Sequence, residues 1–198
     1  MASLKGSFVR PGLVFFSLLF LAGGLHGSQT QPIKLKIIKQ NNNYSCGLAC
    51  LVAVLDYWDV NTSQERLLRL HPPQNGSTGY SLGRLKEIAQ KYGLNAYTLF
   101  ADFEFIHRQL EKGRPLIVSL EVPHNLYNLE FIRDILVYGR VFDYLTRMDT
   151  FSHYVVVCGV DGPHIQIMDP LYGLKTISRQ AFQAMWDRKK NALLLVTA

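Results

Sequence analysis

The stretch from residue 40 to residue 58 constrains this chain most, because it joins a polar turn directly to an apolar helix. Three asparagines at 41–43 and Ser45 favour a turn. From Cys46 onward the residues are mostly apolar and good helix formers. The sequence therefore predicts that a buried helix begins at Cys46.

The predicted position of Cys46 favours a nucleophile. The first turn of a helix has unpaired N–H groups and the positive end of the helix dipole, and both stabilise a thiolate, the nucleophilic form of cysteine. Cys50 follows one turn later and is interpreted as a small buried hydrophobe. The same interpretation would hold for Cys46 unless the chain also supplies a base and an oxyanion donor.

Residues 1–27 have the pattern of a secretory signal peptide. Lys5 and Arg10 give a positive start, an apolar run follows at 13–21, and small residues at 22–27 offer cleavage points. The apolar run is shorter than the roughly 20 residues of a transmembrane helix. We therefore expect export and a single domain at 28–198, and a retained signal would instead anchor the protein to the membrane.

The charge pattern does not predict a nucleic-acid partner. The formal net charge is +6, and two of these positive charges belong to the predicted signal. The one dense basic cluster consists of Lys34, Lys36 and Lys39, and no basic helix or aromatic-basic alternation is present. A nucleic-acid function is therefore not expected.

The cysteines and histidines do not predict a metal or another cofactor. Three cysteines leave at least one thiol unpaired, and Cys50 with Cys158 is the pairing that a helix packed on a sheet would allow. His107, His124 and His164 have no acidic or cysteine partners at metal-ligand spacing. The simplest expectation is no disulfide, no metal and no cofactor.

Hydrophobic periodicity predicts an α+β domain, with helices first and strands later. The helices are expected at 46–58, 63–70, 82–92, 103–111 and 179–187, and the strands at 33–38, 95–100, 116–122, 151–160, 164–169, 174–177 and 193–196. The N-terminal helical part would then pack on an antiparallel sheet.

One predicted hairpin supplies the base that Cys46 needs. If the turn at 161–163 closes an antiparallel pair, residues whose numbers sum to about 324 face each other. His153 then lies opposite Leu171 and diagonal to Asp169, within about 8 Å between α-carbons. The expected site is a Cys46 nucleophile, a His153 base and an Asp169 that orients the imidazole.

These motifs, in this order and spacing, resemble the bacteriocin-processing family of papain-like cysteine peptidases, which cut leader peptides after a Gly-Gly pair. The residues that carry the resemblance are Gln40, Cys46-Gly47-Leu48-Ala49-Cys50-Leu51, His153-Tyr154-Val155-Val156-Val157, Asp169-Pro170 and Gly173. It spans about residues 34–196.

The resemblance implies a papain-like α+β fold and a role for each site residue. Cys46 would be the nucleophile, His153 the general base, Asp169 the orienting acid and Gln40 the oxyanion-hole side chain. The Gln40 amide and the Cys46 N–H would each stabilise the oxyanion by roughly 3 kcal/mol. The expected reaction is hydrolysis of a peptide bond through a thioester intermediate.

Two features differ from the better-known members. Many of them carry an acidic residue before the nucleophile, where this chain has Ser45. They are also cytoplasmic domains fused to peptide exporters, whereas this chain carries a signal sequence. It is similar to the free-standing exported peptidases of bacterial functional-amyloid secretion systems. That similarity implies a periplasmic enzyme whose substrate is a protein or peptide of a secretion system.

Residues 123–150 form a long apolar insertion between two predicted strands, where connections are normally short and polar. We expect one or two helices there. They would serve as a wall beside the cleft, as a docking face for a membrane or secretion component, or simply as an enlargement of the core.

Two other functions stay open at this point. An amidase or transglutaminase-like acyl transferase would use the same residues on an amine acceptor. A non-catalytic peptide-binding or secretion-accessory module would lack a reactive Cys46.

Overall fold

The computed structural model describes residues 30–73, 79–123 and 150–198. The predicted signal at 1–27 and nearly all of the apolar insertion at 123–150 lie outside the described residues. Within the described ranges, no helix is both long enough and apolar enough to cross a membrane.

The α+β class with an antiparallel sheet is confirmed. The helices are α1 (Cys46–Tyr57), α2 (Gln64–Leu70), α3 (Leu82–Lys91), α4 (Phe103–Glu111) and α7 (Arg179–Asp187). The strands are β1 (Asn95–Phe100), β2 (Leu116–Pro123), β3 (Thr150–Asp161), β4 (His164–Asp169), β5 (Gly173–Ser178) and β6 (Ala192–Thr197). Every predicted helix is present, and every predicted strand except the first.

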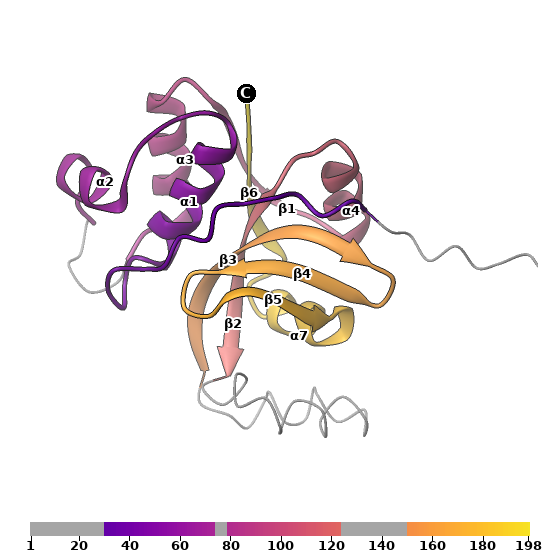
Figure 1. The fold of residues 1–198 in the computed structure, drawn as a ribbon. Helices are drawn as coiled ribbons and strands as arrows, with labels where there is room; N and C mark the ends of the chain where they lie inside the picture. Colours follow the sequence, from indigo (N-terminus) through magenta and orange to yellow (C-terminus); the bar gives the residue numbers. More distant parts are fainter. Residues whose placement is uncertain (1–29, 74–78, 124–149) are drawn as a thin grey trace, which may run out of the picture.

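The six strands form one antiparallel sheet in the order β1-β6-β2-β3-β4-β5. Figure 1 shows α1, α2 and α3 grouped on one side of the sheet and α7 on the other. Alternation along the strands explains the two layers, since Ile117 and Val156 pack with the first helices whereas their neighbours Val118 and Val157 pack with α4 and α7. Both faces of the central strands are therefore buried, whereas the edge strands β1 and β5 are partly exposed.

Helix α1 lies at the centre of the first layer. Every residue from Gly47 to Leu55 is buried, so this helix is apolar on all sides, as expected for a helix enclosed by its neighbours. It packs across β3 and β2 and contacts α2 and α3. Because the helix cannot slide or rotate without disrupting this packing, its first residue, Cys46, has a fixed position relative to β3.

The predicted β3–β4 pairing is correct over the half of the hairpin nearest the site. Val156 lies opposite Met168 and Val157 opposite Ile167, which gives the expected sum of 324. Between Val157 and Gly159 the register shifts by one, so that the pairs next to the turn sum to 325. On its other side β3 pairs with β2, and His153 lies opposite Leu120.

The predicted strand at 33–38 is wrong, because this segment is extended without joining the sheet. Two backbone bonds tie its start to β3, from Thr30 N to Val160 O at 2.9 Å and from Ile33 N to Cys158 O at 2.8 Å. The β2–β3 ladder reaches as far as Val157. On that side of β3, only the residues after Val157 are free of β2, which leaves too few positions for a strand to pair with. The segment continues past them toward α1 (Figure 1).

All three cysteines are free, so the Cys50–Cys158 pairing that the sequence allowed does not form. Each buried thiol donates instead to a backbone carbonyl, Cys50 to Tyr154 O at 3.3 Å and Cys158 to Gln166 O at 3.4 Å. Burial raises the pKa of the Cys158 thiol to about 12 and raises that of Cys50 well above its ordinary value. Both thiols are therefore structural.

Candidate active site

Cys46 is the first residue of α1 and is half-buried, in contrast to the fully buried Cys50. The residue before it, Ser45, occupies the N-cap position, but its side chain makes no capping bond to the helix. The first turn of α1 also carries no acidic residue. The positive end of the helix therefore acts on the thiol without a competing carboxylate or cap hydroxyl.

The hydroxyl of Ser45 is used by the preceding turn instead. Its oxygen accepts from Asn41 N at 3.1 Å and from Asn42 N at 3.2 Å, and it donates to Asn42 O at 3.2 Å. These bonds fold residues 40–45 back on themselves. Gln40 is thereby brought next to the start of α1, although five residues separate it from Cys46.

The Gln40 amide is oriented by its own turn. Its Nε2 donates to Asn42 O at 2.8 Å, which uses one of the two N–H groups on that nitrogen. Its Oε1 is buried and has no hydrogen-bond partner among the described residues. The second N–H of Nε2 remains for another acceptor.

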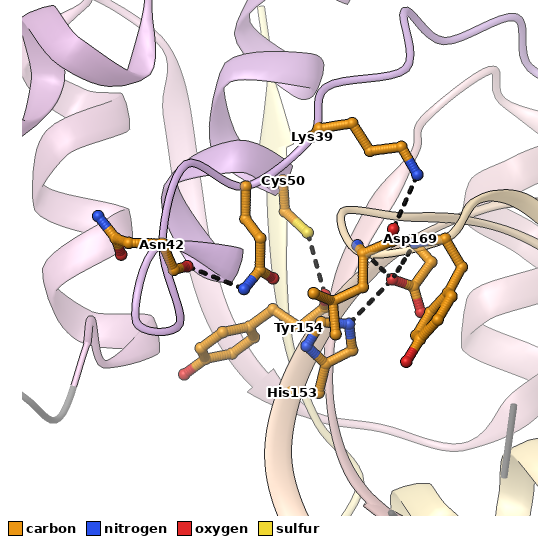
Figure 2. Close-up of polar contacts among 9 residues, drawn as sticks. Lys39, Asn42, Cys50, His153, Tyr154 and Asp169 are labelled. Atoms are coloured by element: carbon orange, nitrogen blue, oxygen red, sulfur yellow. Dashed lines mark hydrogen bonds and ion pairs between the residues drawn. The ribbon is translucent and has the colours of Figure 1, made fainter. Parts of the chain in front are cut away.

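His153 and Asp169 form a buried pair, as the hairpin register predicts. His153 Nε2 lies 3.1 Å from Asp169 Oδ1, with side chains that are 2% and 0% exposed. The same Oδ1 accepts from Leu171 N at 2.7 Å and Tyr172 N at 3.3 Å, which fixes the carboxylate. Figure 2 shows the His153 ring directed at the Asp169 carboxylate.

The charges around His153 favour its protonated form. Burial lowers the pKa of His153, but hydrogen bonds to Asp169 and Cys46 and the negative charges of both groups outweigh burial and raise the pKa to about 9. Because Nε2 faces Asp169, Nδ1 is the ring nitrogen left for the Cys46 sulfur. His153 is therefore an imidazolium at neutral pH.

The turn that follows Asp169 is bonded to the segment that carries Gln40. Gln40 N donates to Pro170 O at 3.0 Å, and Lys39 Nζ donates to Leu171 O at 2.8 Å (Figure 2). The structure thus brings together all four of the residues that the sequence singles out, which come from the turn before α1, from α1, from β3 and from β4.

The sequence pattern of the Peptidase_C39-like family matches residues 32–193, which is most of the chain and includes all four residues. The chain belongs to the Peptidase_C39-like family. It is therefore a cysteine peptidase, and the predicted family resemblance is confirmed. No curated protein matches the chain.

Solved structures of C39 peptidases share the fold at low sequence identity. The peptidase domain of Streptococcus ComA, a bi-functional ABC transporter of a quorum-sensing pathway, is 21% identical with a TM-score of 0.58, covering 83% of this chain and 98% of that one. A putative C39-like peptidase from Bacillus anthracis is 15% identical with a TM-score of 0.62, covering 86% and 98%. A double glycine motif protease from an AMS/PCAT transporter, in complex with the leader peptide, is 18% identical with a TM-score of 0.51, covering 85% and 97%.

Tyr154, which the sequence motif includes without giving it a role of its own, is a neighbour of the site in this C39-like peptidase. Its ring packs against Gly47, where an added Cβ would lie 3.1 Å from the ring. Burial raises the pKa of Tyr154 to about 12, with further contributions from the charges of Cys46 and Cys50. The only sequence signals for this contact were that Tyr154 directly follows His153 and that Gly47 directly follows Cys46.

Gln64 was missed by sequence reasoning. It is buried, and its side-chain amide bonds to the backbone of Lys39 and Asn41, the residues on either side of Gln40. A glutamine in the first turn of the short helix predicted at 63–70 gives no sequence signal of burial, so its contact with the turn before α1 could not be anticipated.

Proposed function

We propose that this cysteine peptidase hydrolyses a peptide bond after small residues such as Gly-Gly, with Cys46, His153, Asp169 and Gln40 as its catalytic residues. The observation that carries the proposal is the buried His153–Asp169 pair beside a cysteine at the start of a helix. A reactive thiol, a base with an orienting acid, and a nearby amide donor are the components that acyl transfer needs.

In the proposed cycle, the Cys46 proton passes to His153 and the sulfur attacks the scissile carbonyl carbon. The Gln40 amide and the Cys46 N–H stabilise the oxyanion. The C–N bond then breaks, His153 protonates the leaving amine, and a thioester remains. Water gives its proton to His153 and its hydroxide to the acyl carbon, which releases the acid and restores the thiolate–imidazolium pair.

The substrate we propose is a secreted bacterial protein or peptide handled by a secretion system. The structural neighbour solved with its leader peptide supports a peptide ligand for this fold. The signal pattern at 1–27 supports export to the periplasm. Cell fractionation and the mass of the mature chain would test export, with a new N-terminus expected at Leu25 or Ser28.

Peptides that differ only at the cleavage junction would test the reaction. Wild-type protein is incubated with a peptide containing Gly-Gly and with the same peptide carrying Val-Val, and products are identified by mass spectrometry. Cleavage after Gly-Gly that disappears in Cys46→Ala and persists in Cys158→Ser would support the proposal. Transfer of the acyl group to an added amine without hydrolysis would point to an acyl transferase, and binding without any Cys46 reactivity would point to a binding module.

A further inference from the structure

Gln64 is buried although it stands at the first position of the short surface helix α2. It is only 7% exposed, and both polar atoms of its side chain are engaged. Its Nε2 donates to Lys39 O at 2.6 Å, and its Oε1 accepts from Asn41 N at 3.3 Å. These are the backbone groups immediately before and immediately after Gln40.

This pair of bonds fixes the orientation of Gln40. Each peptide unit is planar, so holding the carbonyl of Lys39 and the N–H of Asn41 fixes the two planes that meet at the Gln40 α-carbon. From the opposite side, Gln40 N donates to Pro170 O at 3.0 Å. Gln40 is therefore clamped between α2 and the turn that follows Asp169.

The helix that carries Gln64 is itself held in place. Leu67, one turn further along α2, is fully buried in the core formed with α1. Ser63 caps the helix by accepting from Arg66 N at 3.2 Å. The Gln64 amide is thus presented by a packed element and not by a loop, which is the arrangement that holds a reactive group in place.

We propose that Gln64 is a positioning residue of this peptidase, which directs the Gln40 amide toward the oxyanion without contacting substrate. The inference rests on the proposed oxyanion role of Gln40. Ser45 Oγ shares the Asn41 N–H with Gln64, so the distinctive contribution of Gln64 is the 2.6 Å bond to Lys39 O.

The test compares two reactions of the same thiol. Acylation of Cys46 by p-nitrophenyl acetate develops charge on a carbonyl oxygen, whereas alkylation by iodoacetamide takes place at a saturated carbon and needs no oxyanion donor. In Gln64→Met we expect the acylation rate to fall about 10-fold or more and the alkylation rate to change less than about 2-fold. Gln64→Glu, which can accept from Asn41 N but cannot donate to Lys39 O, should show the same selective loss.

A matched control is available on the opposite side of the molecule. Gln109 on α4 is also 7% exposed and accepts one bond, from Arg114 Nη1 at 3.3 Å. Gln109→Met removes a buried glutamine amide of the same size and should leave both rates unchanged. In a Gln40→Ala background, Gln64→Met should have no further effect on acylation, because the amide that it positions is gone.

The outcomes separate this inference from the proposed function. Acylation that falls in Gln40→Ala but not in Gln64→Met would overturn the positioning role alone. A Gln64→Met protein that loses both rates together, with a lower melting temperature, would show a structural role and also overturn it. A wild-type Cys46 that is alkylated but not acylated, or acylation unaffected by Gln40→Ala, would refute the proposed oxyanion site and this inference with it.

Discussion

Asp169→Asn tests directly what keeps His153 protonated. The Asp169 side chain is fully buried, and its Oδ1 faces His153 Nε2 and the N–H groups of Leu171 and Tyr172. Asparagine keeps a carbonyl oxygen for these three groups, while it removes the negative charge and replaces the second carboxylate oxygen by an amide nitrogen. In Asp169→Asn, burial still lowers the pKa of His153 and only Cys46 still raises it, so we expect that pKa to fall from about 9 toward its ordinary value of 6.5.

The size of the effect on stability follows from the pKa shift. The pKa of His153 lies at about 9 in the folded protein and at about 6.5 in the unfolded chain, and each pKa unit corresponds to 1.36 kcal/mol, so the shift represents about 3 kcal/mol. A folded-state pKa above the unfolded one contributes stability that is fully present below pH 6.5 and is lost as the pH rises toward 9. The excess stability of wild type over Asp169→Asn should therefore be about 3 kcal/mol larger at pH 6 than at pH 9.5.

Urea unfolding of both proteins at the two pH values measures this difference, and NMR titration of the His153 ring measures the pKa itself. Taking the difference between the proteins cancels the lysines and tyrosines that also titrate in this range. A difference in stability that stays constant from pH 6 to pH 9.5, or a His153 ring that titrates near pH 6.5 in wild type, would refute the reasoning.

Three further changes have expected outcomes. Gly47→Ala places a Cβ 3.0 Å from Leu85 Cδ1, and because Leu85 is fully buried and cannot easily move away, the change should lower the free energy of unfolding by about 1–3 kcal/mol in urea melts, with slower alkylation of Cys46. Ile117→Ala empties a fully buried position in the first core layer and should cost about 2–5 kcal/mol, with an unchanged ratio of acylation to alkylation in the folded protein. Deletion of Cys158 should remove the bulge in β3 but keep Val157 opposite Ile167 and His153 on the same face as Asp169, so hydrolysis should persist in a protein that circular dichroism shows to be folded.

The helices could be predicted closely because their signals are local. Four of the helices begin after a residue whose side chain accepts from the backbone N–H three residues later: Ser63, Ser81, Asp102 and Ser178. The residue type at each of these positions therefore predicts where the helix begins. The strand order could not be predicted, since β6 lies between β1 and β2 only through contacts distant in the sequence. For the same reason the sequence identified Cys46 and Gln40 but not Gln64, which acts across more than twenty residues.

The prediction that His153 and Asp169 share one face was correct because of a bulge that the sequence did not reveal. Next to the turn, the residue numbers of paired positions in β3 and β4 sum to 325. If that register continued along the strands, His153 and Asp169 would lie on opposite faces of the sheet. The extra residue at Cys158 restores the sum of 324 at Val157 and beyond, which returns both side chains to one face. A bulge also strengthens the local twist of a strand, and Cys158 O accepts from Ile33 N, in the segment that leads to Gln40. The irregularity in β3 therefore aligns His153 with Asp169 and lies where the segment that leads to Gln40 is attached.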